Sequence, residues 1–175
     1  TQSSQGKSVQ LRHLFSDAPL VLTDTTVLNN FSQVRRSDLL RNGVRNLAAP
    51  IEVREELAAG ERLGRVPSCD WSWLRLIELS SDERTRAAEL RGRLESGEAA
   101  CIAVVLSRGG LLLTDDRAAR QLAVSLNLEV SGTLGILNRL VKLEVLTLDE
   151  ADELLVEMMA QGYRSPVRSL REIDS

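Results

Sequence analysis

The chain has 175 residues, of which 43% are hydrophobic and 27% charged, and its formal net charge is −3. This composition is typical of a folded domain, and we expect no membrane segment because no apolar run approaches the roughly 18 residues of a span. A single histidine, His13, argues against a Ser–His–Asp triad, and two cysteines without metal-ligand spacing indicate a reducing, cytoplasmic environment.

Hydrophobic periodicity and helix-capping signals divide the chain into strands and helices. Pro50 and Gly60 bracket one predicted helix, and Ser80 with Glu83 forms the capping box of another. The predicted strands are residues 19–24, 44–49, 73–79, 111–116 and 128–130. The predicted helices are residues 25–33, 37–43, 50–60, 80–94, 96–109, 117–126, 133–143 and 149–161. This order predicts one α/β sandwich on a parallel sheet over residues 19–165, with a polar leader (1–18) and a polar tail (166–175).

Acidic side chains follow two of the predicted strands. Asp24 ends the first strand, and Asp115 and Asp116 end the fourth. Ligand sites in parallel sheets lie outside the carboxyl ends of the strands, at the switch in strand order, so neighbouring first and fourth strands would bring these acids together. Predicted helices near this edge carry further acids, namely Glu98, Glu55 and Glu56. Oxygen ligands without His or Cys select hard ions such as Mg²⁺ or Mn²⁺, which promote phosphodiester hydrolysis.

These segments resemble the PIN-domain family of metal-dependent nucleases, which includes the toxins of VapBC-type toxin–antitoxin modules. The resemblance covers roughly residues 19–165. It rests on the order and spacing of the motifs LTDTTVLNN (22–30), PIEVREEL (50–57), GEAA (97–100), LTDDRAAR (113–120) and GTLGIL (132–137). The last three look most like a standalone prokaryotic subgroup. The resemblance implies a three-layer α/β/α fold with a central parallel sheet.

The resemblance also implies site residues and partners. Its catalytic acids fall on Asp24, Glu56, Glu98 and Asp116. Its metal ligands, for Mg²⁺ or Mn²⁺, fall on Asp24, Glu98, Asp116 and the neighbouring Asp115. It also places Thr25 or Thr26 near the metal, with Thr25 as a substrate contact. Arg117 and Arg120 flank the acids in sequence, and we expect them to hold the phosphate backbone of the substrate. The implied protein is a cytoplasmic, homodimeric endoribonuclease that acts on RNA and, as a toxin, pairs with an antitoxin protein.

Each of these assignments has a structural alternative. The aspartates could cap helices, and Glu98 could complement the positive end of a helix dipole. Glu55 competes with Glu56, and Asp115 competes with Asp116. Arg117 and Arg120 could pair with carboxylates instead of phosphates. For the whole protein, one alternative is a catalytically silent PIN-fold module that binds RNA or protein. A receiver-like regulatory domain is a second, but its expected late lysine could only be Lys142, inside a predicted helix.

Overall fold

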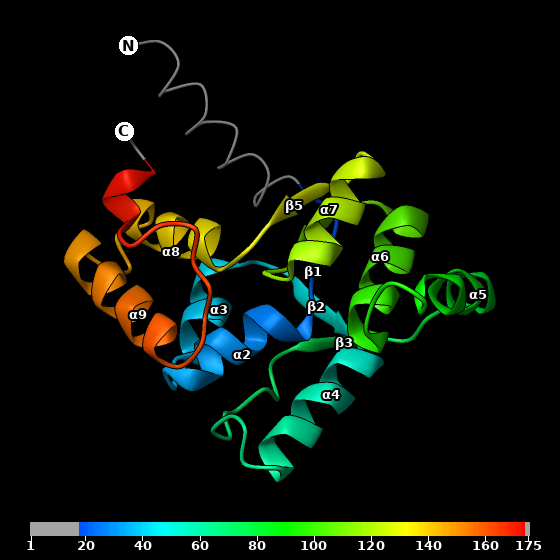
Figure 1. Cartoon of the computed structure of the whole chain (residues 1–175), viewed down its shortest axis with the longest axis horizontal. Helices are drawn as coiled ribbons and strands as arrows, with labels where there is room; N and C mark the ends of the chain where they lie inside the picture. The colour runs from blue at the N-terminus through cyan, green and yellow to red at the C-terminus, as the bar shows by residue number, and fades with distance from the viewer. Residues whose placement is uncertain (1–17, 174–175) are drawn as a thin grey trace.

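The computed structural model describes residues 18–173 and contains one five-stranded parallel sheet (Figure 1). The strands are β1 (Val21–Thr23), β2 (Leu47–Pro50), β3 (Arg75–Ile77), β4 (Leu111–Leu113) and β5 (Glu129–Ser131). They lie in the order β3-β2-β1-β4-β5, and every pairing is parallel. The predicted parallel sheet is confirmed. Apart from Ala18, the predicted leader lies outside the described residues, as does His13.

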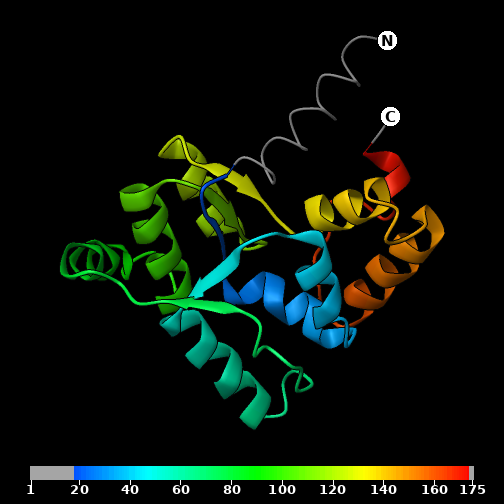
Figure 2. The same ribbon diagram turned by 180° about the vertical axis from the view of Figure 1, so that it is seen from behind.

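The described residues form eight α-helices, close to the predicted ranges. They are α2 (Thr25–Gln33), α3 (Ser37–Gly43), α4 (Ile51–Arg62), α5 (Ser81–Leu90), α6 (Ser96–Arg108), α7 (Arg117–Ser125), α8 (Thr133–Lys142) and α9 (Leu148–Ala160). Figures 1 and 2 place α5, α6 and α7 on one side of the sheet and α2, α3, α8 and α9 on the other. The three-layer α/β/α prediction is therefore confirmed. No helix of the described part is long and apolar enough to cross a membrane.

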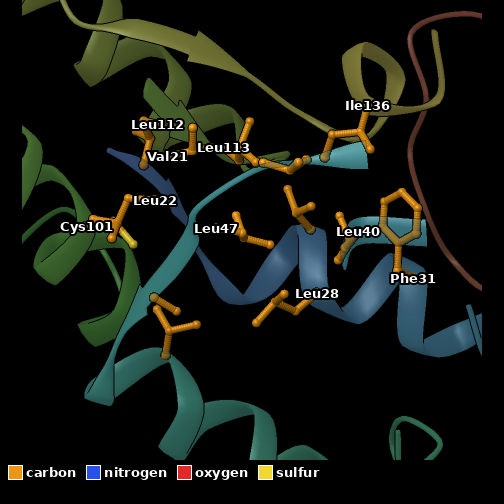
Figure 3. Packing of buried hydrophobic residues seen from close by; sticks show 14 of the residues in the cluster. Val21, Leu22, Leu28, Phe31, Leu40, Leu47, Cys101, Leu112, Leu113 and Ile136 are labelled. Carbon is orange, nitrogen blue, oxygen red and sulfur yellow. The ribbon is translucent and has the colours of Figure 1, made fainter. Parts of the chain in front are cut away.

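The core lies on both faces of the central strands. Leu22 and Leu112 are almost fully buried, as expected for a strand covered by helices on each side. In Figure 3, Cys101 of α6 lies beside Leu22, whereas Phe31 and Ile136 lie on the opposite side with α2 and α8. Helix α6 is buried from residue 97 to 105. Its acidic first turn is therefore held rigidly against the sheet.

The switch in strand order falls between β1 and β4. The chain leaves β1 toward β2 and β3 and later returns to β4 on the other side of β1. Thr23 is in register with Leu113, and the Asp24 amide donates to the Leu113 carbonyl at 3.0 Å. The residues after these two strands, Asp24 and Thr114, are therefore neighbours at the carboxyl edge of the sheet.

The segment after α9 is less loose than its polar composition suggests. It contains a 3-10 helix, η1 (Leu170–Glu172), and Leu170 is 2% exposed. The Ser169 hydroxyl and the Leu170 amide donate to Asp152 of α9 at 2.8 and 2.7 Å. One buried leucine and one acidic partner thus dock most of the predicted polar tail, whereas residues 174 and 175 lie outside the described part.

Candidate functional site

Asp24 follows β1 and begins α2. Its Oδ1 accepts hydrogen bonds from the Thr26 amide (3.0 Å), the Thr26 hydroxyl (2.6 Å) and the Val27 amide (3.3 Å). Its Oδ2 accepts a short hydrogen bond from the Thr114 hydroxyl. Complete burial raises the pKa of Asp24 to about 7, although the bonds from Thr114 and Thr26 oppose the rise. This carboxyl group therefore titrates near neutrality.

One hydroxyl links the acid after β1 to the acid after β4. Thr114 Oγ1 donates to Asp24 and accepts a hydrogen bond from the Asp116 amide at 3.1 Å. Asp116 in turn caps α7, because its Oδ2 accepts from the Ala119 amide at 2.9 Å. Its Oδ1 accepts no hydrogen bond from the described residues. Asp116 thus keeps one oxygen for another ligand while it fixes the start of α7.

The carboxyl edge of the sheet that carries Asp24, Asp116 and Glu98 is called the acidic edge below. Glu56, and not its neighbour Glu55, faces this acidic edge. Glu56 Oε1 accepts from the Gly97 amide at 2.5 Å, and Oε2 accepts from the Thr25 hydroxyl at 2.8 Å. These bonds join α4 to the first turns of α6 and α2. Glu55 is exposed. A Cβ at Gly97 would lie 2.8 Å from Glu56 Oε2, so glycine is what lets α4 approach this closely.

Glu98 lies in the first turn of α6 and is buried. It forms a capping box with Glu95, whose amide donates to Glu98 Oε2 at 3.3 Å. Burial raises the pKa of Glu98 to about 7, with further contributions from the negative charges of Asp116 and Glu56. Glu98 is therefore close enough to Asp116 and to Glu56 to be repelled by both.

Asp115 has a different environment from Asp116. Its Oδ1 accepts from the Thr133 amide at 2.9 Å, and its Oδ2 accepts from the Asn30 side-chain amide at 2.8 Å and from the Thr133 hydroxyl. The Thr26 hydroxyl accepts from the Asp115 amide at 2.9 Å. Asp115 thus joins β4 to α2 and α8, and burial raises its pKa.

Sequence reasoning missed several residues of this network. Asn30 and Thr133 hold Asp115, and Thr114 joins Asp24 to the Asp116 backbone. All three lie inside the quoted motifs, at positions 30, 133 and 114. As residue types, Asn and Thr indicate only turns or helix caps. Their side-chain partners at this site are distant in sequence, so no local pattern pointed to these contacts.

The chain was then compared with known proteins. A family model described as a PIN domain matches residues 20–174. The chain belongs to the PIN-domain family. No curated protein matches it. PIN domains are generally nucleases that use divalent metal ions, so the fold is of a nuclease type. The matched range extends beyond residue 165 and includes the docked segment that contains η1.

The acids of this PIN domain suit a hard divalent ion by their chemistry. The acidic edge offers only oxygen donors, and Glu98 Oε1, like Asp116 Oδ1, accepts no hydrogen bond from residues 18–173. A cation there would also relieve the repulsion that raises the pKa of Glu98. However, no three Asp, Glu, His or Cys side chains of the described part converge as a metal-binding group. Both oxygens of Asp24 are taken by hydroxyl and amide donors.

Two cavities of this PIN domain flank the acids along the sheet edge. One, of about 470 Å³, includes Thr25, Glu56, Arg65 and Arg91 on the β2 side. The other, of about 510 Å³, lies on the β5 side. Arginines line both cavities, so an anionic chain that crosses the acidic edge would find cations on either side.

The structure places the two predicted substrate-binding arginines at the second cavity. Arg120 donates to the Thr114 carbonyl at 2.9 Å, and its charge opposes the rise in the pKa of Asp115. Arg117 is exposed. Neither arginine forms a salt bridge within the described residues, so the alternative of carboxylate pairing is not what the structure shows. Thr25 instead contacts Glu56.

The acids also have the helix-capping roles that were the structural alternatives to a site role. Asp24 and Asp116 cap α2 and α7, and Glu98 completes the capping box of α6. Capping and a site role are compatible here, because a helix that begins at the carboxyl edge of a sheet puts its cap residue at that edge.

Proposed function

We propose that this PIN domain is a Mg²⁺- or Mn²⁺-dependent endoribonuclease. The observation that carries the proposal is the position of Glu98, which is buried beside the strand-order switch and close enough to Asp116 and Glu56 that their charges add to the effect of burial in raising its pKa. Like charges gathered without basic partners are typical of a cation site. Asp24, Glu98 and Asp116, with Asp115 as a further candidate, would hold the ion. When bound, such an ion supplies an activated water and neutralises charge on the phosphodiester.

The remaining residues would position the substrate and the acids. Arg117 and Arg120 are placed to hold phosphate groups on the β5 side of the edge. The bonds from the Gly97 amide and the Thr25 hydroxyl fix the carboxylate of Glu56 toward Glu98. RNA is the proposed substrate, and single-stranded RNA would fit an edge with an open cavity on each side.

The experiment is an RNA cleavage assay with paired glutamate variants. We expect the purified protein to cut single-stranded RNA in the presence of Mn²⁺ or Mg²⁺, and we expect EDTA to stop the cleavage. Glu56→Gln should reduce the rate by about 100-fold or more, since acid–base and metal-site groups contribute on that scale. Glu55→Gln, one residue away but exposed, is the matched control and should cleave normally. Cleavage that persists in EDTA would contradict the metal-dependent mechanism.

A second function is favoured by one observation. The described residues contain no ready-made group of three metal ligands, and hydrogen bonds from the protein occupy both Asp24 oxygens. A catalytically silent PIN-fold module that binds RNA or a protein would need no metal. Retention of labelled RNA without cleavage, at any Mn²⁺ or Mg²⁺ concentration and with equal affinity in EDTA, would support this module over the nuclease.

We also propose that the protein acts in the cytoplasm as the toxin of a toxin–antitoxin pair. The resemblance to VapBC-type toxins motivates this proposal, and the partner would be a small antitoxin protein encoded beside it. Expression of the protein should arrest growth, Glu98→Gln should abolish the arrest, and the product of the adjacent small reading frame should relieve it. Normal growth on expression of an active nuclease would indicate a solitary enzyme instead.

A further inference from the structure

The cavity on the β5 side has an apolar wall and a third arginine, Arg164, to which the proposed function assigns no role. Its walls come from α7, β5, the start of α8 and the segment Tyr163–Pro166 that follows α9. Figure 1 draws this segment in orange-red, where the chain runs back from α9 toward η1. The volume of about 510 Å³ lies within the range of small-molecule sites. The cavity is therefore large enough for one nucleotide.

Three arginines line this cavity. Arg117 and Arg120 come from α7, and Arg164 comes from the segment after α9. Within residues 18–173 none of these arginines forms a salt bridge, although elsewhere in the molecule Arg36, Arg108 and Arg171 do. The acid in the wall, Asp115, already accepts hydrogen bonds from Thr133 and Asn30. The guanidinium groups of Arg117 and Arg164 are thus available to an anion from outside, whereas Arg120 already donates to the Thr114 carbonyl and its charge acts on Asp115.

The same cavity has an apolar surface. Val130, Leu134 and Tyr163 line it and are half-buried, and Pro166 lines it and is exposed. An inorganic anion would gain nothing from these side chains, whereas a nucleobase could pack against the tyrosine ring and the aliphatic groups. Cations and a partly apolar surface in one cavity match the two chemical parts of a nucleotide.

We propose that this cavity binds one nucleotide of the RNA next to the cleaved phosphodiester, with its phosphate at the arginines and its base against Tyr163. Asp115 in the wall directly precedes Asp116 in the chain, so the cavity adjoins the acidic edge. The inference rests on the proposed nuclease function and makes the segment after α9 a determinant of RNA recognition.

The first test measures binding without cleavage. Full-length protein in EDTA is titrated calorimetrically with uridine 5′-monophosphate, adenosine 5′-monophosphate, the nucleosides and inorganic phosphate. We expect at least one mononucleotide to bind about tenfold more tightly than its nucleoside or phosphate, because both of its parts are engaged. Equal binding of phosphate and mononucleotides would overturn the proposal in favour of a simple anion site, and no binding at millimolar ligand would also overturn it.

The second test uses matched variants of the same segment. Arg164→Gln should weaken mononucleotide binding about tenfold, as expected for one charge-assisted contact. Arg168→Gln is the control, since Arg168 is exposed, lies four residues further on and does not line the cavity. Tyr163→Phe should retain binding because it keeps the ring. Equal affinities for the Arg164 and Arg168 variants would contradict the proposal, and melting curves would verify that each variant is folded.

Cleavage kinetics separate this inference from the proposed function. With Mn²⁺ and a short RNA, Arg164→Gln should raise KM about tenfold and leave kcat within about twofold. An Arg164 variant that cleaves as well as the wild type would overturn the subsite but not the nuclease. A wild type that binds mononucleotides but leaves RNA intact would support the subsite and refute the nuclease.

Discussion

Asp24 is buried and Asp115 is half-buried, and the pKa of each carboxyl group is raised, yet removal of the charge should change stability in opposite directions at the two positions. Around Asp24, the partner of Oδ2 is a hydroxyl, Thr114 Oγ1, which can turn and accept a hydrogen bond from an amide. Around Asp115, Oδ1 accepts from the Thr133 backbone amide, which cannot become an acceptor, and Oδ2 accepts from the Asn30 side-chain amide, which could offer its oxygen only by turning over and losing its bond to Thr133 Oγ1. An asparagine therefore fits the first position and conflicts with the second.

We expect Asp24→Asn to raise the melting temperature of the metal-free protein at pH 8 and Asp115→Asn to lower it. The pKa of Asp24 rises from 3.8 to about 7, so removal of its buried charge stabilises by at most about 4 kcal/mol. Asp24→Ala should instead destabilise, because the Thr26 and Val27 amides lose their acceptor. Thermal melts in EDTA provide the measurement, and a lower melting temperature for Asp24→Asn would show that the charged form is the stabilising one.

The raised pKa of Asp24 also predicts how stability depends on pH. Between pH 4 and pH 7 the folded protein holds a proton that the unfolded chain releases, so the free energy of unfolding should fall as pH rises through this window. The lowered pKa of Glu83, about 2 beside Arg108, acts in the other direction but only below about pH 4.5. Urea denaturation at several pH values in EDTA tests this prediction. If the free energy of unfolding of the wild type falls with pH no more steeply than that of Asp24→Asn, the prediction is contradicted.

At the scale of elements, the contact between α4 and α6 depends on the absence of a side chain at Gly97. Alanine is usually better than glycine in a helix, so helix propensity alone predicts a gain of about 1 kcal/mol on substitution. In the structure an added Cβ would lie 2.8 Å from Glu56 Oε2 and 3.0 Å from Val53 Cγ2. The tertiary contact therefore reverses the sign of the expected effect.

We expect Gly97→Ala to destabilise the protein by about 1–3 kcal/mol, the usual cost of overpacking, and to reduce RNA cleavage by displacing Glu56. Gly92→Ala is the control, because nothing lies within 4 Å of its added Cβ. Urea denaturation and the cleavage assay are the measurements. If both alanine variants behave alike, the close approach of α4 to α6 does not matter for stability or for the position of Glu56.

At the scale of the whole molecule, the exposed apolar side chains do not gather on one element. Leu63 follows α4, Leu76 lies on the edge strand β3, Val124 is on α7 and Val156 is on α9. Helix α8 is rich in apolar residues, but Ile136, Leu137 and Leu140 are buried within the protomer. The prediction of a homodimer therefore depends on the family resemblance and on scattered exposed residues.

We still expect a homodimer, with a mass about twice 19.3 kDa at micromolar concentration. Light scattering coupled to size exclusion would measure it, in EDTA and in Mn²⁺, so that metal-dependent association is separated from a permanent pair. A mass of about 19.3 kDa under both conditions would refute the prediction and leave each protomer with a complete acidic edge of its own.

Local sequence signals were sufficient for the secondary structure and for the acids at strand ends. Asp24 and Asp116 each begin a helix directly after a buried strand, and the capping box at Ser80 forms as predicted. These features depend on neighbours within about four residues, and chain order does not alter them. The parallel sheet followed from the alternation of strands and helices, since parallel strands need crossover connections.

Only the tertiary structure distinguished residues that are adjacent in the chain. Glu56 and Glu55 have the same chemistry, and the approach of α6 determines which one meets the Gly97 amide. Asp115 is bound by Asn30, 85 positions away in sequence, and by Thr133, 18 positions away, so local patterns hold no information about its partners. The sequence by itself determined where helices and strands begin, because those signals are local. Which side chains share one edge was decided by long-range packing, because it brings together residues that no short motif connects.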